Sequence, residues 1–101
     1  MLTDDELRQM VRPGWLPLVR PLVEACEREN VPIFQIKEKF GGLRFYLDGV
    51  ASEALHAMIK AATEVSYRTC EECGRPGKHQ SFRGWLATLC EDCATSRRQD
   101  G

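Results

Sequence analysis

Residues 70–93 read CEECGRPGKHQSFRGWLATLCEDC and contain two Cys-x-x-Cys pairs, Cys70 with Cys73 and Cys90 with Cys93, separated by sixteen residues. Each Cys-x-x-Cys turn directs two sulfurs toward one point about 2.3 Å away, and two such turns complete a tetrahedron. This spacing is typical of four cysteines that bind zinc. Two redox pairs and four buried structural cysteines are the rival interpretations, but two matched pairs within so short a segment favour the metal. Because four sulfurs fill the coordination shell and leave no position for water, we expect one structural Zn²⁺.

The residues around these cysteines predict the local fold. Cys73-Gly74 closes a first knuckle, and segments 78–82 and 85–89 predict a hairpin across Arg83-Gly84. The second cysteine pair leads into a segment with acidic residues at its start and arginines at its end, which favours a helix. A knuckle, a hairpin and a helix that begins at the second pair follow the order of a treble clef. The sequence therefore predicts a treble-clef-like zinc module over residues 67–101.

Residues 1–66 predict a separate α+β module. Thr3 and Glu6 form a capping box that opens a helix to about Met10 or Val11. Apolar residues at helical spacing predict a second helix over 15–28, with a kink or restart at Pro21. Strands are expected at 33–40 and 43–47 around Gly41-Gly42, followed by a helix over 52–66 that Ser52 caps. The predicted order is α-α-β-β-α, a small antiparallel hairpin packed with helices, and we expect both modules to form one compact unit.

The period of two along the strands assigns the two faces of this hairpin. The face expected to join the core contains Phe34, Ile36, Phe40, Leu43, Phe45 and Leu47. The opposite face contains Gln35, Lys37, Lys39, Arg44 and Tyr46, and a two-residue turn at Gly41-Gly42 places Lys39 opposite Arg44. This face is either an ordinary solvated surface or a partner-binding platform made of Lys37, Lys39, Arg44 and Tyr46.

Composition and the cysteine count indicate the class of protein and its cellular compartment. The chain has 101 residues, with 14 Lys and Arg against 15 Asp and Glu, so it is not a strongly basic nucleic-acid binder as a whole. Five cysteines without a secretory signal predict a reducing, cytoplasmic environment, and no apolar run is long enough for a membrane span. Cys26 lies at helical spacing from Leu18 and Leu22, which indicates a small core residue and not a reactive thiol.

Two resemblances follow from these motifs. Segment 36–46, which reads IKEKFGGLRFY, followed by a helix, by TCEECG at 69–74 and by Gly84-Trp85 before the second pair, resembles a set of small uncharacterised zinc-binding proteins of bacteria and their phages. That resemblance implies the two-part layout and a cytosolic setting, and it implies no activity. Segment 70–93 alone is similar to GATA-type fingers, to secondary-channel regulators of RNA polymerase and to phage recombination endonucleases. The endonuclease pattern fails here, because no Asp precedes His79 and Ala94 stands where an Asn is required.

Two binding functions are considered, and both are favoured over catalysis. The sequence has no Ser/His/Asp set and no glycine loop between a strand and a helix, so we expect no enzyme. The leading hypothesis is an adaptor or inhibitor that binds another protein, with zinc in a structural role. The alternative is a nucleic-acid-binding zinc finger, which would use the hairpin platform together with Lys78, Arg83, Arg97 and Arg98.

Overall fold

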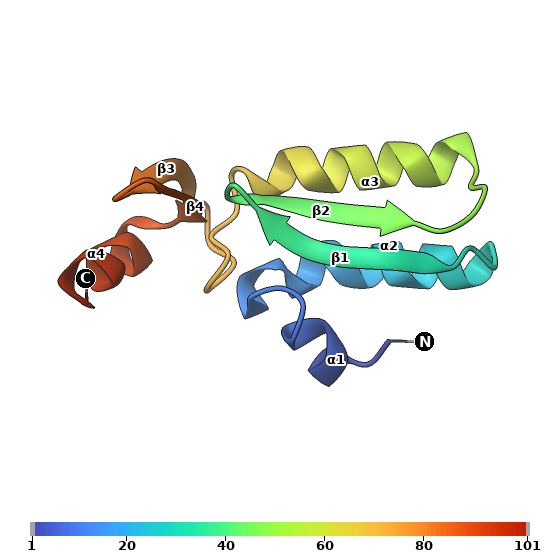
Figure 1. Ribbon diagram of the computed structural model, residues 1–101, viewed down its shortest axis with the longest axis horizontal. Helices are drawn as coiled ribbons and strands as arrows, with labels where there is room; N and C mark the ends of the chain where they lie inside the picture. Colours follow the sequence, from blue (N-terminus) through green and yellow to red (C-terminus); the bar gives the residue numbers. More distant parts are fainter. Residues whose placement is uncertain (1, 101) are drawn as a thin grey trace.

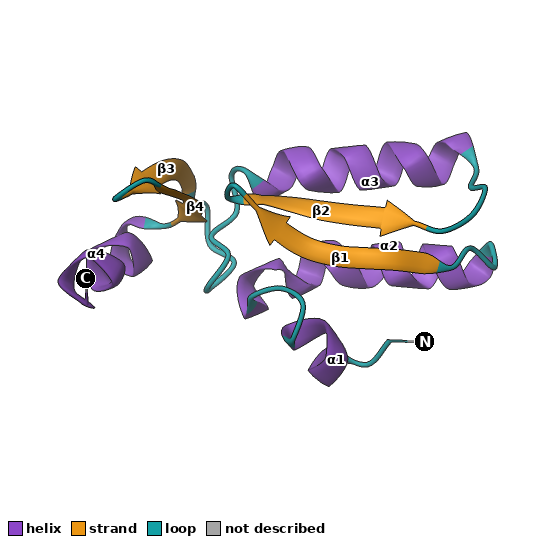
Figure 2. Ribbon diagram, in the orientation of Figure 1, coloured by secondary structure: helices purple, strands orange, loops and turns teal. Residues whose placement is uncertain are grey.

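A computed structural model describes residues 2–100 and shows an elongated α+β molecule that measures 44 × 25 × 21 Å. The elements are α1 (Asp4–Arg8), a 3₁₀ turn η1 (Pro13–Trp15), α2 (Leu16–Arg28), β1 (Ile33–Lys39), β2 (Gly42–Leu47), α3 (Glu53–Ser66), β3 (Lys78–Phe82), β4 (Trp85–Leu89) and α4 (Glu91–Asp100). The strands form two separate antiparallel hairpins, β1–β2 and β3–β4 (Figure 2). The predicted fold class and order of elements are confirmed. Within the described range, no helix is long and apolar enough to cross a membrane.

Local side chains explain where the helices begin and end. Thr3 and Glu6 make the predicted capping box, although α1 ends at Arg8, earlier than expected. Ser52 accepts a hydrogen bond from the backbone N–H of Leu55 and starts α3, as predicted. The restart predicted as one possibility at Pro21 does not occur, because α2 continues through this residue. Pro21 is exposed and removes only its own N–H, while the buried residues that follow it hold the helix against the core.

The turn of the β1–β2 hairpin lies one residue earlier than predicted. Phe40 and Gly41 are its two central residues, with φ of 55° and 81°, which is the backbone of a type I′ turn. Gly42 is instead the first residue of β2, where a Cβ atom would overlap the ring of Tyr67. In this register the position next to Tyr67 therefore requires a glycine. Arg44 consequently pairs with Lys37, and the predicted pair of Arg44 with Lys39 is wrong.

The helices cover one face of this hairpin. Ile36, Leu43 and Phe45 are buried against them as predicted, and Leu47 packs against the same core. Two residues predicted for the core are exposed, Phe34 to 70% and Phe40 to 61%. A bulge between Ile33 and Gln35 inserts Phe34 as an extra residue, so Ile33 takes the inward position instead. Phe40 lies in the turn and has no strand face at all.

Replacing residues on opposite faces of β2 tests this assignment. Phe45→Ala is expected to lower the free energy of unfolding by about 3 kcal/mol, because a buried ring leaves a cavity. Tyr46→Ala is expected to cost less than about 1 kcal/mol, because Tyr46 is 41% exposed on the open face. Denaturant titration of both variants measures the difference, and equal losses would contradict the assignment of the faces.

The zinc region, residues 67–100, packs against one end of residues 2–66, which we call the helix–hairpin part (Figure 1). The N–H of Gly14 donates to the carbonyl of Glu71 over 2.8 Å, and the indole Nε1 of Trp15 donates to the carbonyl of Thr69 over 2.9 Å. A Cβ atom on Gly14 would overlap the backbone of Cys70 and Gly74. The 3₁₀ turn therefore lies directly on the first cysteine knuckle.

The β1–β2 turn makes the second contact between the two parts. The hydroxyl of Thr88 donates to the carbonyl of Gly41 over 2.7 Å, and this bond is buried. A ring nitrogen of His79 lies 2.7 Å from the carbonyl of Phe40, and the His79 ring packs edge-on against Tyr67. These polar contacts fix the orientation of the zinc region relative to the hairpin.

Candidate metal centre

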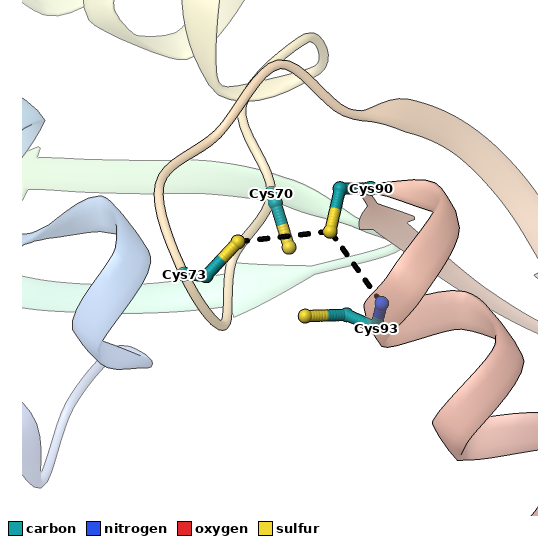
Figure 3. A group of neighbouring side chains, drawn as sticks. All are labelled: Cys70, Cys73, Cys90 and Cys93. Carbon is teal, nitrogen blue, oxygen red and sulfur yellow. Dashed lines mark hydrogen bonds between the residues drawn. The ribbon is translucent and has the colours of Figure 1, made fainter.

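The four cysteines that the spacing singled out converge on one point (Figure 3). Cys70 and Cys73 lie in the loop after α3, Cys90 directly follows β4, and Cys93 lies in the first turn of α4. Their sulfurs all lie within 4.8 Å of one another, and those of Cys73 and Cys90 are 3.6 Å apart. A tetrahedron with metal–sulfur bonds of about 2.3 Å has edges of about 3.8 Å. The cluster is thus suited to one metal ion, and four sulfur ligands favour Zn²⁺.

The backbone of each Cys-x-x-Cys turn explains why the sulfurs converge. In the first knuckle the N–H of Gly74 donates to the carbonyl of Cys70 over 2.9 Å, and Gly74 has a φ of 82° that favours glycine. In the second, the N–H of Cys93 points at the sulfur of Cys90 from 3.4 Å. This pair sits at the start of α4, where the helix dipole stabilises thiolate charge.

The four cysteines lie close enough to shift one another's pKa values. Burial raises the pKa of Cys70, but N–H groups of Cys90, Cys73 and Glu72 donate to its sulfur and bring the pKa down to about 7. The nearby sulfur of Cys90 raises the pKa of Cys93 well above its usual value. Four adjacent sulfurs do not all ionise without a compensating cation. A divalent metal supplies that charge, and its binding is coupled to deprotonation.

Charged side chains outside the cluster complete its surroundings. Glu72 is paired with Arg97 at 3.5 Å and with Arg12 at 3.3 Å. The carboxylate of Glu71 is almost fully buried, which raises its pKa, and lies 3.8 Å from Arg97. Arg12 precedes the 3₁₀ turn, so one of these ion pairs also joins the zinc region to the helix–hairpin part. Two guanidinium groups therefore lie beside the carboxylates of the first Cys-x-x-Cys turn.

Comparison with models of known protein families, with curated proteins and with solved structures gives no match. The assignment of the metal centre accordingly rests on the geometry and chemistry of the four cysteines. The resemblance to small bacterial and phage zinc proteins stays a prediction.

The predicted partner platform is only partly available for binding. The register places Lys37, Lys39, Arg44 and Tyr46 on one face of the hairpin, as expected. Arg44, however, donates to the hydroxyl of Tyr67 over 3.0 Å and to its neighbour's carbonyl, so its guanidinium helps to join the hairpin to the zinc region. Lys37 lies 6.0 Å from the ring centre of Tyr46. Lys39 and Tyr46 remain exposed on this face, and Lys37 is half-buried beside Tyr46.

A groove of about 1020 Å³ lies where the two parts meet, and no sequence pattern predicted it. We call it the junction groove. Its walls are segment 8–12, residues 37–40 at the end of β1, and residues 84–86 of the zinc hairpin, with Glu71 and Arg97 between them. Because these segments are far apart in sequence and share no periodic pattern, only the folded chain reveals that they meet.

The residues of the alternative nucleic-acid platform are divided between two places. Arg83, Arg97 and Arg98 line a second hollow of about 550 Å³ together with Trp85 and Phe82. Arg97 and Arg98 lie 5.7 and 5.2 Å from the ring centre of Phe82. Lys78 begins β3, at the opposite end of that strand from Phe82. Trp85 and Arg97 line both this hollow and the junction groove.

Proposed function

We propose that the protein is an adaptor or inhibitor that acts by binding another protein, and that one Zn²⁺ keeps the binding surface in shape. The junction groove carries this proposal, because it combines an apolar surface with a cationic rim. Protein interfaces have this composition, with aromatic and aliphatic anchors at the centre and charged groups around them.

Exposed apolar side chains supply the centre of the surface. Trp85 is 79% exposed and Phe40 61%, and Met10 and Leu86 beside them are also exposed. Large apolar side chains that gather around a hollow are a common feature of binding sites in monomeric proteins. Tryptophan and arginine are the residues that most often dominate binding energy. We therefore place the main anchor contacts at Trp85.

The charges of the rim indicate an acidic partner. Lys37 and Lys39 line the groove, and neither forms an ion pair with another described side chain. Arg8 and Arg12 lie on the opposite wall, where Asp5 and Glu72 partly neutralise them. The chain as a whole carries a formal charge of −1, so this cationic rim is a local feature. Complementary carboxylates on a partner would speed association and fix its orientation.

Reversing the charges of Lys37 and Lys39 tests the proposal. Lys37→Glu combined with Lys39→Glu is expected to abolish capture of the native partner, because the partner's carboxylates would be repelled. The melting temperature should change little, since neither ammonium group forms an ion pair with another described side chain; Lys39 is exposed, and Lys37 is half-buried next to the ring of Tyr46. Affinity purification from the native host, followed by mass spectrometry, identifies what is captured by the unchanged protein and lost by the variant.

A matched control has the same charge change outside the groove. Lys60→Glu with Arg68→Glu alters two exposed cations that do not line it, and partner capture should be retained. Arg44 is unsuitable for this test, because its loss would also remove the bond to Tyr67. Equal capture by both double variants would place the contact surface elsewhere.

Nucleic-acid binding is the second candidate, and the hollow lined by Arg83, Arg97 and Arg98 favours it. Aromatic rings next to cations are the elements that single-stranded nucleic acids contact, although Arg97 is here also paired with Glu71 and Glu72. Affinity for an oligonucleotide would fall about tenfold or more between low and physiological salt if several phosphates are bound. Binding that is weak and equal at both salt concentrations would contradict this second candidate.

A further inference from the structure

The junction groove follows the free edge of a β-strand. Three consecutive residues at the end of β1, Lys37 to Lys39, line it, together with Phe40 of the turn that follows. Successive side chains of a strand point to opposite faces, so a hollow that touches three in a row reaches the edge of the strand and not one face alone. β1 pairs with β2 on its other edge, and across residues 2–100 the sheet consists of these two strands. The edge beside the groove therefore offers unpaired backbone N–H and C=O groups.

We infer that this groove binds an extended, acidic segment of another protein, which adds to β1 as a third strand. The inference rests on the proposed function, since it assumes a protein partner, and it specifies the chemistry and conformation of that partner. Backbone hydrogen bonds to the edge would provide affinity, and alternate side chains would provide specificity.

The two sides of the groove predict the pattern of the added segment. Side chains on the open face of the sheet would lie next to Lys37 and Lys39, so carboxylates are favoured there. Side chains on the helix side would lie between Glu38 of β1, whose carboxylate accepts from the N–H of Gly41, and segment 8–12, which contributes Met10 and Val11 to the lining. Apolar residues are favoured there, because Glu38 would repel a further carboxylate. The segment should therefore alternate acidic and apolar residues, with an apolar residue near Trp85.

The charges on β1 also argue against a second copy of this chain as the added strand. The sequence of the edge is Lys37-Glu38-Lys39, and two copies side by side would bring their lysines together. Charged side chains on edge strands commonly prevent such self-pairing. An acidic strand gains from the same two lysines that repel a copy.

Trp85 provides a built-in probe for the test. It is exposed in the groove, whereas Trp15, the other tryptophan, is fully buried elsewhere. The zinc-loaded protein is titrated with synthetic peptides of about nine residues, the length of an ordinary strand, in which Glu alternates with Val or Leu. We expect a blue shift of the tryptophan emission that is absent in Trp85→Phe. Lys37→Glu with Lys39→Glu should weaken binding at least about tenfold, and Lys60→Glu with Arg68→Glu should not.

Backbone methylation of the peptide distinguishes strand addition from simple charge attraction. An added strand directs alternate N–H groups toward β1, so methylation of one alternate set should abolish binding and methylation of the other should leave it intact. Equal binding of both methylated peptides would overturn strand addition and leave an acidic protein partner in place. Equal binding of a peptide with Lys in place of Glu would overturn the charge pattern.

Two further outcomes separate this inference from the proposed function. If no peptide binds while the native partner is still captured through the groove, strand addition is wrong and the proposed function stands. If only an oligothymidylate of about fifteen nucleotides binds, with the salt dependence expected of phosphate contacts, both are wrong and the nucleic-acid candidate replaces them.

Discussion

Cys90→Ser is expected to unfold residues 67–100 and to abolish stoichiometric zinc binding. The buried apolar core of this region is small, with Ala87, Leu89 and Ala94 next to the cysteines. A core of this size does not hold a fold alone, so metal binding supplies most of the folding free energy, on the order of 10 kcal/mol for such sites. Elemental analysis should find one zinc per chain in the unchanged protein. Amide hydrogen exchange should show loss of protection in β3 and β4 of the variant.

Chelation and a second substitution serve as controls. A strong chelator should produce the same exchange pattern as Cys90→Ser, while α2 and α3 keep part of their protection. Cys26→Ala should leave the zinc content at one per chain, because Cys26 is buried in the other core, away from the cluster. A metal-free protein whose zinc region stays protected in chelator would contradict the structural role of the ion.

Trp15→Ala is expected to have the second largest effect, a loss of about 5 kcal/mol in the free energy of unfolding. Trp15 has no exposed surface, so truncation would leave a large cavity in the core. Its indole N–H also donates to the carbonyl of Thr69, and truncation would leave that carbonyl without its protein donor. Denaturant titration of the zinc-loaded protein measures the loss.

Trp15→Phe separates the two contributions. This variant keeps most of the ring volume but removes the indole donor, so it should cost about 1–3 kcal/mol. It should also loosen the contact between the two parts more than it loosens α2, which hydrogen exchange at β3 and β4 can detect. Equal costs for the two variants would mean that packing volume contributes little at this position.

The sequence was sufficient to predict the features that depend on neighbouring residues. The capping residues Thr3 and Ser52 are local signals, and both start helices as expected. The two Cys-x-x-Cys pairs needed only their spacing, because each turn alone directs two sulfurs to one point. The zinc hairpin was also placed correctly, since Arg83 and Gly84 occupy a turn in which both residues have positive φ.

Features that depend on contacts between distant segments could not be predicted. The first hairpin places Gly42 in β2 next to Tyr67, which leaves no room for a side chain there, and this contact joins segments far apart in sequence. Arg44 was predicted to bind a partner, but its guanidinium donates to the hydroxyl of Tyr67, which is another contact between distant segments. Phe34 was assigned to the core by alternation alone, and the bulge beside it changes that alternation. The junction groove combines segments from both parts, so no stretch of sequence contains its pattern.

The construction of the junction groove from both parts has a thermodynamic consequence. One wall belongs to the helix–hairpin part and another to the tip of the zinc hairpin, which the metal keeps folded. Any ligand that needs both walls binds the metal-loaded form more tightly than the metal-free form. By reciprocity, that ligand must slow the escape of the ion or speed its capture, raising the affinity for zinc by the same factor. The protein should therefore retain its zinc better at low free zinc concentrations when the groove is occupied, because ligand binding and zinc binding are thermodynamically coupled.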